Sequence, residues 1–303
     1  MMALELNIKL RGELLRGEPM SQHTSWRTGG IVKTLYTPAD REDLVVFLRS
    51  LPADEKILFL GLGSNLLVRD GGIDATVICL HGALAGLTVV ESGADGSIVY
   101  AEAGVACAQL ARFGAQNNLT GSEFFAGIPG TVGGALAMNA GAFGSETWQF
   151  VEKVETLARD GTVGVRGPAD YDIRYRSVTG PEREWFLAGF FRFRRDATGG
   201  GKERIKELLN KRNASQPIGV YSCGSVFRNP PGDYAGRLIE ATGLKGYRIG
   251  GAEVSMKHAN FIINEGTATA QDIEELIIFV QDRVASVQGV RLQPEVHIIG
   301  ERL

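Results

Sequence analysis

The segment from Gly127 to Gly144 reads Gly-Ile-Pro-Gly-Thr-Val-Gly-Gly-Ala-Leu-Ala-Met-Asn-Ala-Gly-Ala-Phe-Gly, and it is the most informative stretch of the chain. It carries six glycines and no ionisable side chain, so it can contact a ligand mainly through its backbone. Glycine allows positive φ angles and a close approach of the main chain, at a cost in conformational entropy. We interpret the segment as a loop whose N–H groups hold a large ligand. The alternative is a tight glycine-packed turn between core elements.

Another glycine-rich segment, Leu60-Gly-Leu-Gly-Ser-Asn-Leu-Leu-Val-Arg-Asp-Gly-Gly72, follows an expected strand over 56–60. In chain order, 60–72 is the first glycine segment and 127–144 is the second. It begins like the dinucleotide fingerprint, but Leu66 stands where the third glycine belongs. A P-loop is excluded because no Gly-Lys-Ser/Thr follows either glycine run. What remains is a nest of N–H groups from Gly63, Ser64 and Asn65, which suits a pyrophosphate. Two such segments indicate an extended cofactor that is held at two places.

Composition narrows the class of protein. The 303 residues suffice for two or three domains. The charge balance of 32 basic against 35 acidic residues argues against nonspecific nucleic-acid binding, which needs a basic surface. Cys79, Cys107 and Cys223 lack the spacing of metal ligands, so we expect reduced thiols and no metal site.

The chain shows no signal-peptide core and no apolar run near the ~20 residues of a membrane span. We therefore expect a cytoplasmic protein without membrane partners, present as a monomer or weak oligomer.

Hydrophobic periodicity predicts an α+β fold. A short helix is expected at the N-terminus. Further helices are expected over 38–49, 108–115, 202–214 and 270–287, the first with Asp40 as its N-cap. Strands are expected over 56–60, 75–80, 87–90, 98–101, 151–157, 185–193, 260–264 and 295–299. The glycine-rich stretch 196–201 predicts a linker. We expect two lobes, 1–82 and 83–196, followed by a third unit over 202–303.

Several motifs together resemble those of the UDP-N-acetylenolpyruvoylglucosamine reductase (MurB) family. The segments 23–30, 61–72 and 127–144 resemble its FAD-binding part. Tyr175-Arg176 and the segments 224–230, 254–264 and 294–296 resemble its catalytic and substrate-binding parts. The match is collinear from about residue 20 to the end of the chain. It implies a two-lobed FAD-binding domain of the vanillyl-alcohol-oxidase (PCMH) type, followed by a substrate-binding domain.

The resemblance also implies an activity. The family reduces the enolpyruvyl ether of UDP-N-acetylglucosamine to UDP-N-acetylmuramate in peptidoglycan precursor synthesis, using NADPH through FAD. Ser225 follows Arg176 by 49 positions, a spacing similar to the shorter, second type of the family, which lacks an inserted substrate-covering loop. No histidine stands at an obvious flavin-attachment position in 61–72 or 127–144, so we expect noncovalent FAD.

The family reaction needs a clamp for a developing enolate and a proton donor to carbon. The resemblance assigns the clamp to Arg176 and Glu295, the latter expected as the neutral acid, and the proton to Ser225. Tyr175, Asn229, Lys257 and His258 are expected to contact the substrate. The residues expected to hold FAD are Trp26, Gly61, Gly63, Ser64, Asn65, Gly127, Pro129, Gly130, Gly133, Gly134, Asn139 and Gly141.

Single residues also have purely structural interpretations: Arg176 could form a surface ion pair, and Ser225 could be a turn residue. Two rival functions also stay open. One is another FAD enzyme on the same scaffold, an oxidase of hydroxy acids or alcohols. The other is a nonredox nucleotide-binding or regulatory protein in which the glycine segments only hold a ligand.

Overall fold

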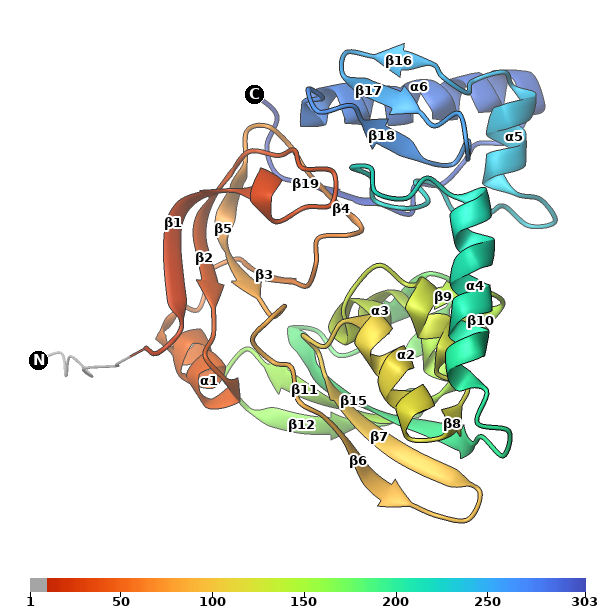
Figure 1. The fold of residues 1–303 in the computed structure, drawn as a ribbon. Coiled ribbons are helices and arrows are strands. Elements are labelled where there is room, and N and C mark those ends of the chain that lie inside the picture. The colour runs from red at the N-terminus through yellow and green to blue at the C-terminus, as the bar shows by residue number, and fades with distance from the viewer. Residues whose placement is uncertain (1–9) are drawn as a thin grey trace, which may run out of the picture.

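The computed structural model describes residues 10–303. The short helix expected at the N-terminus falls mainly on residues 1–9, outside the described part. The chain forms two lobes and a C-terminal unit, with the long helix α4 (Gly201–Ser215) running from the second lobe to the C-terminal unit (Figure 1). None of the helices in residues 10–303 has the length and apolarity needed to cross a bilayer.

The first lobe is a four-stranded sheet with one helix. Its strand order is β1-β2-β5-β3, with β1 antiparallel to β2 and the other two pairs parallel. Asp40 caps α1 as expected, since its Oδ1 accepts a 2.9 Å hydrogen bond from the Asp43 amide. Phe47 of α1 stacks on Tyr36 of β2, which fixes the helix against the sheet. The elements are β1 (Glu13–Pro19), β2 (Ile31–Thr37), α1 (Arg41–Ser50), β3 (Ile57–Leu60) and β5 (Ile73–Cys79).

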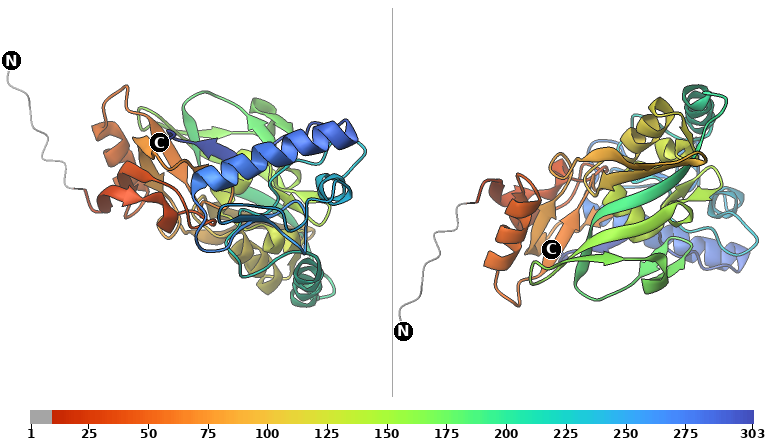
Figure 2. Two further views of the ribbon diagram at one scale, coloured as in Figure 1. Left: turned by 90° about the horizontal axis from the view of Figure 1, so that it is seen from above. Right: turned by 90° about the horizontal axis from the view of Figure 1, so that it is seen from below.

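The second lobe is a six-stranded antiparallel sheet in the order β12-β11-β15-β7-β6, with the short β8 pairing with β15. Its strands lie side by side in the view from below (Figure 2). The strands are β6 (Leu87–Ser92), β7 (Gly96–Glu102), β8 (Leu119–Thr120), β11 (Val151–Ala158), β12 (Val163–Arg166) and β15 (Glu184–Arg195). Helix α2 (Cys107–Gln116) packs against this sheet at the position expected from the sequence.

The long glycine-rich segment is not wholly a loop. Residues Val132–Met138 form helix α3, which the sequence analysis missed. The helix forms because Val132, Ala135 and Leu136 share one helical face and are buried in the core of the second lobe. The segment therefore begins as a loop over 127–131, continues as the short helix α3, and ends that helix at Asn139, which has the left-handed conformation.

The C-terminal unit packs helices α5 (Ala235–Ala241) and α6 (Ala270–Gln288) with a three-stranded sheet. The strands are β16 (Arg248–Ile249), β17 (Ala252–Val254) and β18 (Ile262–Asn264). Thr269 and Asp272 form a capping box at the start of α6, and Gly289 ends the helix with φ 71°. Both α6 and β18 were expected from the sequence to within two residues.

The end of the chain returns to the first lobe. Strand β19 (His297–Ile299) pairs in parallel with β4 (Leu66–Val68), which lies within the first glycine segment. Trp26, from the N-terminal part of the chain, packs into the C-terminal unit. Its side chain is fully buried among C-terminal side chains, and its Nε1 donates to the Ile262 carbonyl at 2.8 Å. The β19–β4 pairing and the burial of Trp26 fix the C-terminal unit against the first lobe.

Candidate active site

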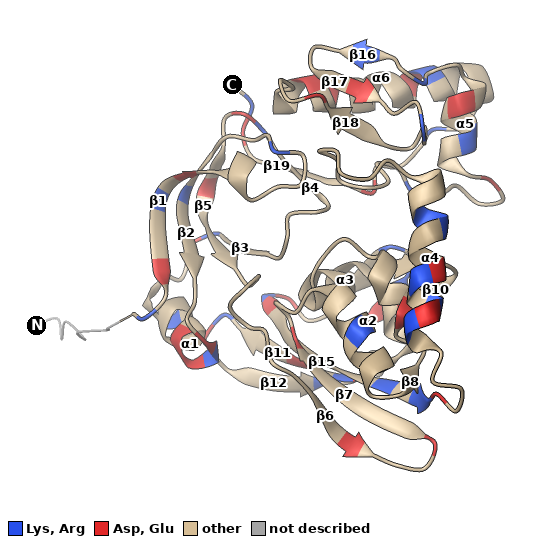
Figure 3. Cartoon of the chain, viewed as in Figure 1, with Lys and Arg blue, Asp and Glu red and all other residues tan. Residues whose placement is uncertain are grey.

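A cavity of about 660 Å³ lies where the two lobes and the C-terminal unit meet. Both glycine segments contribute to its wall, together with side chains from α4 and from the end of the chain. Residues 60–68 and 127–144 include no Lys, Arg, Asp or Glu, so their ribbons are tan in Figure 3. Of the residues expected to hold FAD, those on this wall are Gly61, Gly63, Ser64, Asn65, Gly127, Pro129, Gly130, Gly134 and Gly141.

Close backbone packing explains two of these glycines. A Cβ on Gly61 would lie 2.4 Å from the Thr131 hydroxyl, so the two glycine segments touch each other there. Gly63 has φ 59°, and a Cβ on it would lie 2.0 Å from the His23 carbonyl oxygen. No larger residue fits at either position without displacing backbone or a packed side chain.

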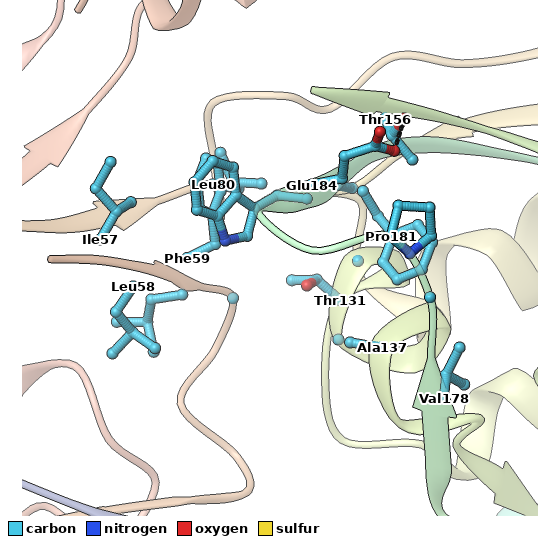
Figure 4. A pocket seen from close by; sticks show the side chains of 18 of the residues that line it. Ile57, Leu58, Phe59, Leu80, Thr131, Ala137, Thr156, Val178, Pro181 and Glu184 are labelled. Atoms are coloured by element: carbon cyan, nitrogen blue, oxygen red, sulfur yellow. Dashed lines mark hydrogen bonds between the residues drawn. The ribbon is translucent and has the colours of Figure 1, made fainter. Parts of the chain in front are cut away.

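A second cavity, of about 370 Å³, continues from the first between the two lobes (Figure 4). The two share Gly61, Thr131 and Gly134, and Gly133 lines the second one. Its walls are mainly apolar, including Leu58, Phe59, Leu80, Ala137, Val178 and Pro181, with Thr156 and Glu184 hydrogen-bonded to each other at one side. Together the two cavities have room for an elongated ligand.

Tyr171 supplies an unsatisfied polar atom in the second cavity. Its hydroxyl is buried and has no hydrogen-bond partner among the described residues. Burial raises the pKa of Tyr171 to about 12, so the hydroxyl is a neutral donor at physiological pH. A buried polar group without a partner destabilises a protein, which indicates that a ligand completes this site.

Arg176 is held at the tip of a tight hairpin. Strands β13 (Asp172–Arg174) and β14 (Ser177–Thr179) pair so that Tyr175 and Arg176 form the two-residue turn between them. Arg176 has φ 55°, a left-handed conformation that costs a non-glycine residue roughly 1–2 kcal/mol. Such strain persists only where surrounding contacts enforce it, and it is typical of functional sites.

The Arg176 guanidinium bridges the second glycine segment and the end of the chain. Its Nη2 donates to the Gly141 carbonyl at 2.9 Å, and its Nε lies 2.9 Å from Glu295 Oε1. The Nε–H is buried yet not aligned on any acceptor among the described residues. The contact with Glu295 is therefore one of charge and proximity, whereas Nη1 and Nη2 each use one N–H on a backbone carbonyl and keep a second N–H without a partner among the described residues.

Glu295 combines burial with two nearby cations. Burial raises the pKa of its carboxyl, while the charges of Arg176 and Arg228 oppose that shift. Its backbone is well fixed: its amide donates to the Val226 carbonyl at 2.7 Å, and Asn65 Nδ2 donates to its carbonyl at 3.0 Å. Asn65 thus ties the first glycine segment to the chain that carries Glu295.

Ser225 lines the same cavity as Arg176 and Glu295. It follows Gly224, which has φ 72°, and its hydroxyl makes no hydrogen bond within residues 10–303. The next residues are rigid, because Asn260 bonds the Phe227 backbone through both its amide oxygen and its amide nitrogen. The structure therefore brings together all three residues that the sequence analysis expected to be catalytic.

Other expected site residues line neither cavity. Trp26 lies in the core of the C-terminal unit, and Asn139 is buried behind the second glycine segment. Tyr175 is 44 % exposed beside the Arg176 guanidinium. Asn229 caps α5, because its Oδ1 accepts from the Ala235 amide at 3.0 Å.

Lys257 and His258 also have partners away from the cavities. Lys257 Nζ donates to the Asn213 carbonyl in α4 at 2.5 Å. His258 packs edge-on against Phe261, and burial lowers the pKa of its ring. Lys257 therefore ties the C-terminal unit to α4.

Arg212, Gln216 and His297 line the main cavity, and the sequence analysis did not single them out. Arg212 lies in the last turn of α4, donates through Nε to Gln216 Oε1 at 3.0 Å, and has no carboxylate partner among the described residues. Burial lowers its pKa. Nothing in the sequence distinguishes it from the other basic residues of this charged helix, since only the packing of α4 turns it toward the cavity.

The arrangement defines a class of protein. Two glycine segments and a long pair of joined cavities suit FAD, and an arginine, a glutamate and a serine face the same space from separate units. Residues 32–165 match the family model described as "FAD binding domain", and residues 216–299 match "UDP-N-acetylenolpyruvoylglucosamine reductase, C-terminal domain". The protein is an FAD-dependent oxidoreductase with a separate C-terminal domain, and the expected α+β fold class is confirmed.

Known proteins identify the family. The chain is 57 % identical over 301 residues to the UDP-N-acetylenolpyruvoylglucosamine reductase of Alkalilimnicola ehrlichii, covering 99 % of each chain. It is 56 % identical over 304 residues to that of Thiobacillus denitrificans, covering 97 % of this chain and 94 % of the relative. The crystal structure of the Thermus caldophilus reductase superposes with a TM-score of 0.79 at 32 % identity, covering 96 % and 99 %. The chain belongs to the UDP-N-acetylenolpyruvoylglucosamine reductase family, and the expected resemblance is confirmed.

Proposed function

We propose that this protein reduces the enolpyruvyl ether of UDP-N-acetylglucosamine to UDP-N-acetylmuramate in the cytoplasm, with NADPH as the reductant. The observation that carries the proposal is the convergence of Arg176, Glu295 and Ser225 on one cavity with both glycine segments. The names of the relatives support the same reaction.

FAD fits the joined cavities. The backbone N–H groups of 63–65 would hold its pyrophosphate, and the second cavity would take its nucleotide end, with the Tyr171 hydroxyl as a hydrogen-bond donor. The glycines of 127–141 would pack against its ring system through backbone alone. Bound in these cavities, FAD would supply the transfer of hydride from NADPH to the substrate.

Arg176 and Glu295 would stabilise the charge that the reaction creates. A hydride added to the terminal carbon of the enol ether drives electrons onto the neighbouring carbon and its carboxylate. The remaining N–H groups of Arg176 Nη1 and Nη2 can bind that carboxylate, and a charged donor in a partly buried cavity is effective there. Glu295, whose pKa is raised by burial, can donate a hydrogen bond as the neutral acid.

Ser225 would then deliver the proton. A serine hydroxyl is a weak acid, but a carbanion-like enolate is a strong enough base to accept its proton. Because the Ser225 hydroxyl has no other partner within the described residues, it is free to point at the substrate carbon. Hydride on one carbon and proton on the other convert the C=C bond into the CH–CH3 of the lactyl ether, and solvent reprotonates the serine.

Arg212 adds a cation for the remainder of the substrate. It lines the cavity from α4 and lacks a carboxylate partner among the described residues, so a diphosphate can bind it at little cost in broken ion pairs. Tyr175, Asn229, Lys257 and His258 stay predicted substrate contacts. The monomeric or weakly oligomeric state likewise stays a prediction.

An anaerobic titration tests the proposal. The protein reduced with NADPH is mixed with the enolpyruvyl UDP-sugar, and the absorbance of oxidised flavin is followed. We expect full recovery of that absorbance at one equivalent of substrate. Absence of recovery, together with oxygen consumption in the presence of 2-hydroxy acids, would instead support an oxidase on the same scaffold.

A further inference from the structure

Asn139 was expected to contact FAD, but its surroundings indicate a different role. It ends helix α3 with φ 43° and ψ 49°, and only 3 % of it is exposed. Asparagine is one of the few non-glycine residues that tolerate this left-handed conformation. Its own carbonyl accepts a hydrogen bond from Arg176 Nη1 at 3.4 Å.

The Asn139 side chain makes three hydrogen bonds within the protein. Its Nδ2 donates to Glu146 Oε2 at 2.9 Å and to the Arg174 carbonyl at 3.2 Å, while its Oδ1 accepts from the Trp148 amide at 3.1 Å. Arg174 is the last residue before the hairpin turn that contains Arg176. The amide therefore joins the second glycine segment to the base of that turn.

Glu146 is also connected to Arg176 through the backbone of Gly141. The short strand β10 (Ser145–Glu146) pairs with β9 (Gly141–Ala142), with Glu146 opposite Gly141. The Gly141 carbonyl in turn accepts from Arg176 Nη2 at 2.9 Å. Glu146 also favours the observed orientation of the Asn139 amide, as the Arg174 carbonyl and the Trp148 amide do, because a carboxylate can only accept from Nδ2.

The turn itself does not hold Arg176 in place. The second residue of a two-residue turn with positive φ is usually glycine or asparagine, so an arginine there relaxes unless outside contacts prevent it. Those contacts come from the Asn139 amide, the Asn139 carbonyl and the Gly141 carbonyl.

We infer that Asn139, oriented by Glu146, is a positioning residue that holds Arg176 for the substrate carboxylate. The inference rests on the proposed function, since it assigns the purpose of this network to the step in which the enol ether is reduced. Asn139 is then not one of the residues that would hold FAD. Its replacement should slow reoxidation of the flavin by the enol ether and leave reduction by NADPH unchanged.

The test measures the two half-reactions separately by anaerobic stopped-flow, together with FAD affinity by fluorescence titration. For Asn139→Ala we expect FAD affinity and reduction by NADPH to stay within about twofold. Reoxidation by the enolpyruvyl UDP-sugar should fall by about 10- to 100-fold, the size of effect that misplacement by about 1 Å produces. Asn118→Ala is the matched control, because Asn118 is also left-handed, with φ 53°, and lies outside both cavities.

Moving the carboxylate from position 146 to position 139 distinguishes a positioning role of Asn139 from a general structural role. Asn139→Asp places a carboxylate beside Glu146 and should slow reoxidation further. Adding Glu146→Gln to Asn139→Asp restores one donor–acceptor pair and should recover part of the rate. Glu146→Gln alone is the milder variant if Asn139→Ala fails to fold, and it should slow reoxidation with reduction unchanged.

Three outcomes overturn the inference. Reoxidation at the wild-type rate in Asn139→Ala or in Glu146→Gln shows that Arg176 needs no such support. An equal loss in both half-reactions, with weaker FAD affinity and no recovery in the double variant, shows a cofactor or folding role. If wild-type protein binds FAD and accepts hydride from NADPH yet is not reoxidised by the enol ether, the proposed function fails and the inference fails with it.

Discussion

Arg176 Nε lies 2.9 Å from Glu295 Oε1, although the chain builds almost the whole C-terminal domain between these two residues. Arg176 comes from the tip of a hairpin attached to the second lobe, and Glu295 comes just before the strand that rejoins the first lobe. The ion pair therefore forms only when all three units are assembled. The Arg176 guanidinium, which would bind the substrate anion, therefore lies where the two lobes and the C-terminal unit meet.

Arg176→Lys keeps the positive charge but removes the planar fork that spans Gly141 and Glu295. We expect the rate of flavin reoxidation by the enol ether to fall by about 100- to 1000-fold, comparable to the loss of one donor to a developing oxyanion. Reduction by NADPH should stay near the wild-type rate. Stopped-flow absorbance measures both. A lysine variant with unchanged reoxidation would show that charge alone suffices.

Gly63→Ala tests the first glycine segment. The new methyl group would lie 2.0 Å from the His23 carbonyl oxygen at a position with φ 59°, so it meets both strain and a backbone clash. Gly82→Ala is the control, because Gly82 has φ 81° with open space around it and adds the strain alone. We expect Gly63→Ala to lower both Tm and FAD affinity clearly more than Gly82→Ala does. Equal effects in calorimetry and FAD titration would argue against close packing there.

Tyr171→Phe removes the buried hydroxyl that lacks a partner among the described residues. In protein stripped of FAD the variant should be as stable as the wild type or more so, because it no longer buries an unsatisfied donor. With FAD present, affinity should weaken by roughly 2- to 10-fold, as expected for one hydrogen bond of about 0.5–1.5 kcal/mol. Unchanged FAD affinity would place the nucleotide end of the cofactor elsewhere.

Glu295→Gln tests the protonation of the clamp. Burial raises the pKa of Glu295 above its ordinary value of 4.5, so the folded protein binds this proton more tightly than the unfolded chain. The stability that this group contributes is present below pH 4.5 and is lost as the pH rises through the raised pKa. Relative to the wild type, Glu295→Gln should therefore gain stability as the pH rises above about 4.5.

Urea unfolding of both proteins between about pH 4 and 8 measures this difference. A stability difference that changes in the opposite direction would mean that the charges of Arg176 and Arg228 outweigh burial, and that Glu295 is ionised in the folded protein.

Local patterns predicted much of the fold. The helix capped by Asp40 and the strand over 56–60 were predicted from capping and periodicity. The structure confirms both, with the strand at Ile57–Leu60. Helix α3 was missed because its glycines have low helix propensity, and burial of Val132, Ala135 and Leu136 overrides that preference. The pairing of β19 with β4 joins distant segments, so no local pattern indicates it.

The candidate site was predictable where a motif carries the chemistry. Arg176, Ser225 and Glu295 meet as expected, because the family resemblance covers all three. Arg212 was missed because a single arginine on a charged helix carries no signal until the helix is placed. Asn139 and Trp26 lie within glycine-rich or family motifs, but their side chains bond to other parts of the protein. A motif shows which segment approaches the ligand and does not show which way each side chain turns.

Replacement of Ser225 separates proton delivery to the substrate from the reduction of the flavin. Ser225→Ala is reduced with NADPH and mixed anaerobically with the enolpyruvyl UDP-sugar in a stopped-flow spectrometer. Ser222→Ala is the control, because Ser222 lies three positions earlier and lines neither cavity. We expect normal reduction by NADPH and a reoxidation rate that falls by about 100- to 10,000-fold, the contribution typical of a positioned proton donor. Reoxidation at the wild-type rate would contradict the assignment of Ser225 as the proton donor, and with it the shared cavity as the place of reaction.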